Sequence, residues 1–197
     1  MANRREFLQI SASALGLMAV PQTVLAGLTP NIKDMPFYKV IFDERYEDCR
    51  VFADEARRMG ATTCAITDDV TELWYGGLRR QLAEHPGVIA GLTNETNAFL
   101  LELLGHDVFH RQVFRGEHSF RNGDLIGHRI NGPENFVAQT SGLPFDQGHW
   151  STDLARLFSY YDNSRPTYPR TSVHTHEHQD PSNLKLVSWI IAPLKKV

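Results

Sequence analysis

The stretch YKVIFDERYEDCRVFADEARRMGATTCAIT, residues 38–67, decides the fold. It begins with Tyr38–Phe42, a short and mostly apolar run of residues that favour strands. Apolar residues then recur at helical spacing over 49–59, and Gly60 stands where a glycine commonly ends a helix. Thr62–Thr67 has the pattern of another strand. The stretch therefore predicts a strand, a helix and a second strand in succession.

The same alternation continues along the chain. A second helix is expected to begin at Asp69 and to be stopped by Pro86-Gly87. A third strand is expected over 88–92 and a third helix over 99–104, which Gly105 would end. Residues 108–114 are expected to form a fourth strand. Alternating strands and helices favour an α/β fold in three layers, in which helices cover both faces of a mostly parallel sheet.

The second half of the chain is richer in strand patterns. From Gly116 the alternation with helices stops, and Asn122-Gly123 is a strong signal for a tight hairpin turn. One more short helix is expected over 151–161, whereas 167–178 and 184–191 have the patterns of extended strands. We therefore expect a β-rich elaboration packed on the first half.

The first 26 residues have the three parts of a bacterial export signal. The charged segment NRREFLQ (3–9) precedes a weakly apolar run over 10–20, and Val24-Leu25-Ala26 has short residues at the positions that a signal peptidase reads. The apolar run is too short to stay in a bilayer as an anchor. The segment resembles the recognition motif of twin-arginine export signals, and the residues that carry this resemblance are Arg4, Arg5, Phe7 and Leu8.

Cleavage after Ala26 would leave residues 27–197 as a single α/β domain. The resemblance implies that the twin-arginine translocase carries the chain, already folded, into the periplasm. Cargo of this route usually holds a cofactor or travels bound to a partner that holds one. A mature N-terminal helix is the alternative interpretation, but residues 1–26 lack an apolar face with a polar face opposite.

Charge and hydropathy limit the partners of the mature chain. The whole chain has a net charge of −3, and removal of the signal with Arg4, Arg5 and Glu6 brings it near −4. An acidic balance argues against nucleic acid or an anionic membrane surface as the main partner. No second apolar run is long enough to span a membrane stably.

The two cysteines are expected to be free and buried. Cys49 falls on the first predicted helix and Cys64 on the following strand. A helix packed on a sheet keeps such residues farther apart than a disulfide allows.

Polar residues follow each predicted strand. Because parallel sheets bind ligands beyond the carboxyl ends of their strands, we expect these residues to converge on one rim. Helix capping is the alternative role for those that precede a helix. The rim candidates are Asp43, Asp68, Arg115, Glu117 and His118.

Common cofactor and catalytic motifs do not occur in this sequence. It has no glycine-rich dinucleotide fingerprint, no phosphate-binding loop ending in Gly-Lys-Ser/Thr, no Gly-x-Ser-x-Gly elbow and no Cys-x-x-Cys. We therefore expect no nucleotide, flavin or covalently attached haem on this chain.

A histidine triplet, VHTHEH over 173–178, is the densest group of chemically versatile residues. Residues at i, i+2 and i+4 of a strand share one face, and neutral imidazoles there suit Zn, Fe or Cu. The segment resembles the His-x-His strand of cupin-type metal sites, although the spaced glutamate and the following glycine of that pattern are missing. pH-sensitive surface histidines and a polar strand end are the alternatives. The triplet is His174, His176 and His178, and His149, His118 or Asp146 could complete a metal shell.

Two functions of different classes follow from these features. The first is an exported accessory or maturation protein that binds a periplasmic oxidoreductase and is exported with it. Small proteins of this kind accompany flavin-dependent alcohol or sugar dehydrogenases that have no signal of their own. The second is a small periplasmic metal-dependent enzyme or metal-binding protein that uses the triplet.

Overall fold

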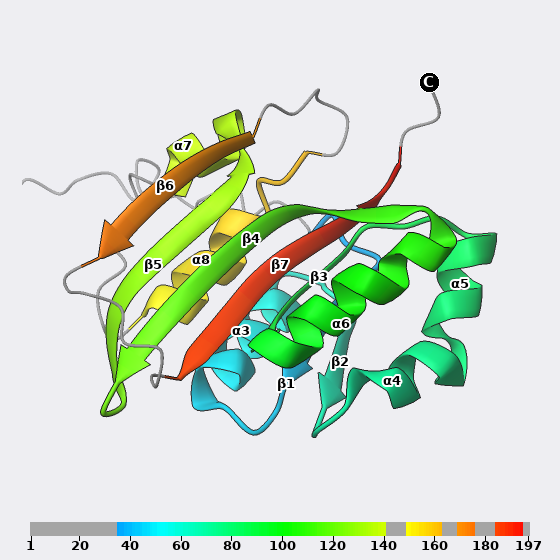
Figure 1. The fold of residues 1–197 in the computed structure, drawn as a ribbon, viewed down its shortest axis with the longest axis horizontal. Helices are drawn as coiled ribbons and strands as arrows, with labels where there is room; N and C mark the ends of the chain where they lie inside the picture. The colour runs from blue at the N-terminus through cyan, green and yellow to red at the C-terminus, as the bar shows by residue number, and fades with distance from the viewer. Residues whose placement is uncertain (1–34, 141–148, 163–168, 176–183, 195–197) are drawn as a thin grey trace, which may run out of the picture. The chain divides into compact units, whose positions relative to one another are not determined.

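The protein is built around a mixed sheet of seven strands (Figure 1). The computed structural model describes residues 35–140, 149–162, 169–175 and 184–194. The strands lie in the order β2-β1-β3-β7-β4-β5-β6. Their bounds are β1 (Lys39–Asp43), β2 (Thr63–Ile66), β3 (Ile89–Asn94), β4 (His110–Arg121), β5 (Asp124–Pro133), β6 (Pro169–Thr175) and β7 (Lys185–Pro193).

Helices pack on both faces of this sheet, so the expected three-layer α/β fold is confirmed. One buried apolar cluster joins the sheet to α3, α7 and α8, and the other joins its opposite face to α4, α5 and α6. In Figure 1, α6 crosses in front of the sheet, while β4 and β5 lie open towards the viewer. The helices are α3 (Glu47–Arg58), α4 (Val70–Leu73), the π-helix η1 (Trp74–Leu78), α5 (Arg79–Glu84), α6 (Glu95–Gly105), the 3-10 turn η2 (His106–Val108), α7 (Glu134–Thr140) and α8 (Trp150–Phe158).

The first half forms the parallel part of the sheet, as the alternation predicts. β1 pairs in parallel with β2 on one side and with β3 on the other. Gly60 ends α3 with a φ of 86°, in the left-handed region that favours glycine. The sequence pattern therefore predicts these three strands and the helices between them well.

The position of the last strand is a correction to the expected topology. The predicted fourth strand does not extend the parallel sheet beside β3, because β7 lies between β3 and β4 and is antiparallel to both. The physical reason is hydrophobicity: Leu186–Ala192 is buried throughout, whereas β4 is buried at some positions and half-exposed at others. Continuously apolar strands belong at the centre of a sheet, covered on both faces.

The hairpin between β4 and β5 turns where predicted. Asn122 and Gly123 have φ angles of 52° and 91°, the pair of positive values that a type I′ turn needs. Beyond the turn the register shifts, because Phe120 pairs with Leu125 but Ser119 pairs with Gly127. This β-bulge leaves Ile126 without a position opposite it and moves every later pairing by one residue.

The end of α6 differs from the expectation. Gly105 keeps a right-handed helical conformation with a φ of −57°, and the chain turns only at Phe109, which has a φ of 57°. The residue packs closely against β7, because an added Cβ would lie 3.4 Å from Cγ2 of Ile191, a distance of ordinary van der Waals contact.

Both cysteines are free, as expected. Cys49 is buried on α3, whereas Cys64 is only half-buried, because β2 is an edge strand. Within the described ranges, every helix is too short or too polar to cross a bilayer.

Candidate functional site

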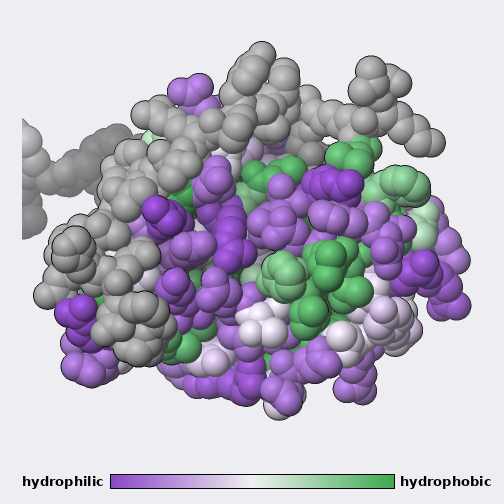
Figure 2. Space-filling model, viewed as in Figure 1, coloured by the Kyte–Doolittle hydropathy of each residue, from purple (hydrophilic) through white to green (hydrophobic). Residues whose placement is uncertain are grey.

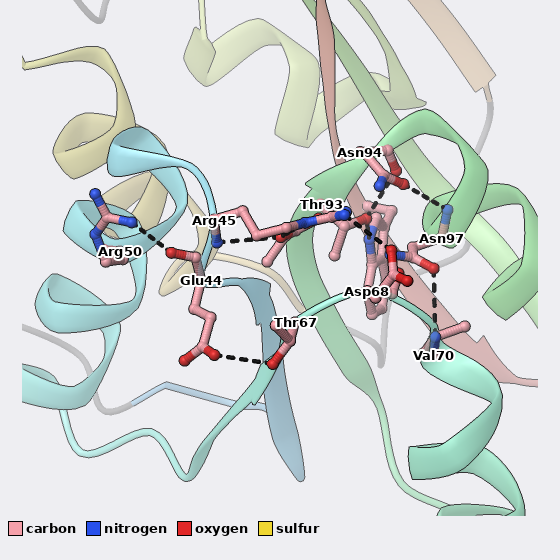
Figure 3. Close-up of polar contacts among 11 residues, drawn as sticks. Glu44, Arg45, Arg50, Thr67, Asp68, Val70, Thr93, Asn94 and Asn97 are labelled. Atoms are coloured by element: carbon pink, nitrogen blue, oxygen red, sulfur yellow. Dashed lines mark hydrogen bonds and ion pairs between the residues drawn. The ribbon is translucent and has the colours of Figure 1, made fainter.

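The carboxyl ends of β1 and β2 meet at one rim, and an arginine joins their carboxylates. Asp43 is fully buried, and Arg45 donates to both of its oxygens over 2.9 and 2.8 Å. The same guanidinium donates to the exposed Asp68 over 2.9 Å. The hydrogen bond with Asp43 is the main reason why the pKa of Arg45 is raised. Asp43 and Asp68 therefore come together as predicted, but through a bridging cation. Figure 3 shows the side chain of Arg45 extending towards Asp68.

An asparagine network continues this rim towards β3. Asn94 caps α6 by accepting from the backbone N–H of Asn97 over 2.8 Å. The amide of Asn97 is buried and donates to the carbonyl oxygen of Asp68 over 2.9 Å, while its oxygen accepts from the backbone of Val70. Figure 3 shows Asn97 next to Asp68 and Val70 of the β2–α4 loop and Asn94 at the end of β3. The network fixes the β2–α4 loop against α6.

Capping is the role that the structure shows for Asp69. Its side chain accepts from the backbone N–H of Thr71 over 2.9 Å and from the hydroxyl of the same residue. The hydroxyl bond, followed by the backbone bond, lowers the pKa of Asp69. Thr93 is also occupied, since its hydroxyl oxygen accepts from Trp189 over 3.2 Å.

A cavity of about 790 Å³ opens beside the free edge of β2. Ile66, Thr67 and Asp68 line one side, and the α4–η1 segment lines the other. Within the α4–η1 segment, Gly77 has a φ of 152°, and this backbone conformation interrupts the regular helix.

Arg115 and Glu117 form a second group, on the other side of β7 from β1 and β2. They lie along β4, and Arg115 contacts Glu117 over 3.1 Å and Glu95 of α6 over 3.4 Å. The insertion of β7 separates them from the strand ends, because Glu117 pairs with Val187, which in turn pairs with Thr93. With Arg129 and Asn131 they line a polar hollow of about 340 Å³. The predicted convergence therefore holds only in part: β7 keeps Arg115 and Glu117 apart from Asp43 and Asp68, but Arg115 reaches Glu95, which follows Asn94 of the rim.

His118 belongs to a third place, on the face of the sheet that α8 covers. It is completely buried, and its Nε2 lies 2.8 Å from the hydroxyl of Ser188. Its Nδ1 lies 2.6 Å from Nδ1 of His128 on β5, and Trp150 packs over both imidazoles at centroid distances of 4.5 and 5.6 Å. Burial, and secondarily His128, lowers the pKa of His118, so its imidazole is neutral near pH 7. The prediction that His118 lies at the rim is therefore wrong.

His128 was not among the predicted site residues. The Asn122-Gly123 turn alone would place Gly127 opposite His118, and the bulge at Ile126 replaces it with His128. The sequence carries no clear signal for this shift.

The predicted histidine triplet is described only in part. His174 lies in β6, where it pairs with His128 in the antiparallel ladder. His176, His178 and Asp146 lie outside the described residues, as do the signal residues Arg4, Arg5, Phe7, Leu8 and Ala26. Among the side chains that the structure describes, no three His, Cys, Asp or Glu groups are placed to hold a metal ion.

Comparison with known proteins gives no assignment. No protein-family model matches the chain, and no curated protein or solved structure matches it.

Proposed function

We propose that the protein is an exported accessory protein that binds a periplasmic oxidoreductase and crosses the membrane with it. The observation that carries this proposal is the outward surface of α6. Phe99 and Leu103 lie one helical turn apart there, with 57% and 52% of their surface exposed. Figure 2 shows the corresponding apolar patch among hydrophilic neighbours, in the region where Figure 1 places α6.

The composition of α6 supports a partner on this surface. Ala98–Leu101 is a run of four apolar residues, which at about 100° per residue covers nearly the whole circumference of a helix. Ala98 and Leu101 are buried against the sheet, but Phe99 has no such cover within the chain as described. Helices that are apolar all round are normally buried, and contiguous exposed apolar patches commonly mark interaction sites.

The twin-arginine resemblance supports the kind of partner. The route carries folded proteins, and it can export a signal-less enzyme that rides on a signal-bearing companion. The polar groups that gather at the rim, Asp43, Arg45 and Asn97 among them, are engaged with one another. These contacts hold the β1–α3 and β2–α4 loops together and against α6.

Deletion of the gene tests the function directly. We expect a flavin or haem dehydrogenase without an export signal to remain in the cytoplasm in the deletion strain, and to return to the periplasm on complementation. Unchanged export of every such enzyme would overturn the proposal.

The α6 surface is tested by the double substitution Phe99→Ser with Leu103→Ser. Both side chains are exposed, so the fold should survive while the dehydrogenase no longer co-purifies from periplasm. Tyr75→Ser is the matched control, because Tyr75 is 69% exposed on η1, outside α6. Equal recovery of the enzyme with the double variant and the control would exclude α6 as the docking surface.

Export itself is tested by Arg4→Lys together with Arg5→Lys. We expect unprocessed precursor to accumulate in the cytoplasm. Normal periplasmic amounts of the mature chain would show that it uses another route.

A further inference from the structure

One edge of the sheet is open at β2. This strand is the last in the sheet order, and the backbone oxygens of Thr62 and Ile66 accept from β1 and the residue that follows it. Successive residues of a strand turn their backbone groups alternately to the two sides, so Thr63 and Ala65 face away from β1. Among the described residues these two have no backbone partner, and the oxygen of Ala65 has only a 3.8 Å contact with the Cys64 thiol. Such an edge is a template for another strand.

The cavity of about 790 Å³ lies along this edge and has room for an added strand. Ala65 and Ile66 line it from β2, and Leu73, Gly76 and Leu78 line it from the α4–η1 segment. Figure 1 shows β2 at the end of the sheet, with α4 and α5 beside it. An added Cβ at Gly76 would have no atom within 4 Å, so this wall is open. An edge strand with free backbone groups and pockets for side chains is what β-strand addition uses.

The two ends of the cavity carry opposite charges. Lys39 lines it at the amino end of β1 and forms no ion pair with any described residue. Asp68, Asp69 and Glu72 line it beyond the carboxyl end of β2. Arg45 neutralises Asp68 in part, whereas Glu72 is exposed and has no ion pair within the described ranges. A segment that lies along β2 is therefore next to a cation at one end and next to carboxylates at the other.

We propose that an extended peptide segment of a partner protein binds in this cavity as a further strand, antiparallel to β2. Antiparallel pairs are slightly more stable per residue than parallel ones. A strand in that direction begins beside Glu72 and ends near Lys39. The segment therefore carries a lysine or arginine at its amino end and a glutamate or aspartate at its carboxyl end, separated by about the four residues of β2. This site is independent of the α6 surface, because neither Phe99 nor Leu103 lines the cavity.

An NMR titration of the isotope-labelled full chain with a synthetic peptide is the first test. The probe is the capped hexapeptide Lys-Thr-Val-Thr-Val-Glu, and in its control peptide the two charged residues are exchanged. The probe should shift the amide signals of Thr63 and Ala65 and slow hydrogen exchange at Ala65. The control peptide should bind at least about fivefold more weakly, because attraction becomes repulsion at both ends. Unchanged Ala65 signals at millimolar probe would overturn the proposal, and equal binding of the two peptides would refute the assigned direction.

Backbone methylation of the probe distinguishes strand addition from attraction by charge alone. A strand bonds with one neighbour through every second residue, so methyl groups on alternate nitrogens block only one of its two edges. One probe carries N-methyl groups on its second and fourth residues, and the other carries them on its third and fifth. One of the two should lose binding at least about tenfold, because its bonds with β2 are gone, while the other should keep it. Equal affinity of both methylated probes would overturn strand addition.

Gly76→Phe tests the place of the site on the protein. Gly76 is exposed and lines the cavity, so a phenylalanine there should fill it and weaken binding of the probe at least about tenfold. Gly76→Ala, which leaves the cavity open, and Ala83→Phe, which adds the same ring on exposed α5 outside the cavity lining, are the matched controls. Both should bind within about twofold of the wild type, and melting temperatures check that all three variants fold. Wild-type affinity in folded Gly76→Phe would overturn the proposed site.

Discussion

Glu55 connects the two helices that cover one face of the sheet. It lies on α3, is 9% exposed, and accepts from Arg58 of the same helix over 2.8 and 2.7 Å. Arg156 of α8 donates to it over 2.8 Å. The hydrogen bond from Arg58, followed by that from Arg156, outweighs burial and lowers the pKa of Glu55 from 4.5 to about 2.

The lowered pKa of Glu55 sets an upper limit on the stability that Glu55→Gln should lose. Since a tenfold change in proton affinity corresponds to about 1.4 kcal/mol, the lowered pKa limits the stabilisation to about 3.4 kcal/mol. Both arginines are about half exposed, so solvent screening reduces this figure. We expect the substitution to lower the free energy of unfolding at pH 7 by about 1 to 2 kcal/mol.

The pH dependence follows from the direction of the shift. A carboxyl with a lowered pKa in the folded state stabilises the protein fully above its unfolded pKa of 4.5. That stabilisation is lost as the pH falls from 4.5 towards about 2. The difference between wild type and Glu55→Gln should therefore be constant near neutrality and shrink through this acid range.

Urea unfolding at a series of pH values, followed by far-UV circular dichroism, measures this difference. Asp54→Asn is the matched control, because Asp54 is 72% exposed and its ion pair with Arg57 lies on the same helix. The control should change little, as exposed ion pairs contribute little. A Glu55→Gln variant as stable as the wild type at pH 7, or a difference that does not shrink in acid, would refute the reasoning.

Two further predictions concern the sheet and the thiols. Gly91→Ala should lower the free energy of unfolding, measured by urea titration, by at least about 3 kcal/mol. The reason is that the added Cβ would lie 2.2 Å from a backbone oxygen of β1 and 2.5 Å from the Trp189 ring. Gly76→Ala is the control and should be tolerated, because an added Cβ there would have nothing within 4 Å. A thiol reagent should label the half-buried Cys64 quickly and Cys49 only on unfolding, since burial foremost raises the pKa of the Cys49 thiol; rapid labelling of both in the native protein would contradict this.

The local parts of the fold could be predicted from the sequence. The predicted range Tyr38–Phe42 covers all of β1 except Asp43, and Thr62–Thr67 contains β2. The Asn122-Gly123 turn lies where its residues indicate. These features depend on neighbouring residues, whose spacing a sequence records directly. The place of β7 could not be predicted, because the pattern of Leu186–Ala192 indicates burial on both faces without naming its neighbours.

The candidate site was less predictable, for a related reason. Asp43 and Asp68 lie close together, as predicted, because they stand at the ends of β1 and β2, and parallel strands end at a common edge. The position of Glu117 could not be predicted, because it depends on β7, which lies between β3 and β4. The residue that pairs with His118 depends on a bulge of one residue. Pairing across strands is set by register, and a shift by one residue changes every cross-strand neighbour.

The central place of β7 ties completion of the fold to the order of synthesis. β7 joins the β1–β3 half to the β4–β6 half, yet the ribosome makes it after every other strand of the sheet. Before residues 185–193 emerge, neither half has its inner partner, and both expose strand edges that are prone to mispairing. The nascent chain therefore cannot close its sheet until residues 185–193 have left the ribosome. Under the proposed export of folded cargo, the translocase would receive this chain only after β7 has left the ribosome and paired with both halves.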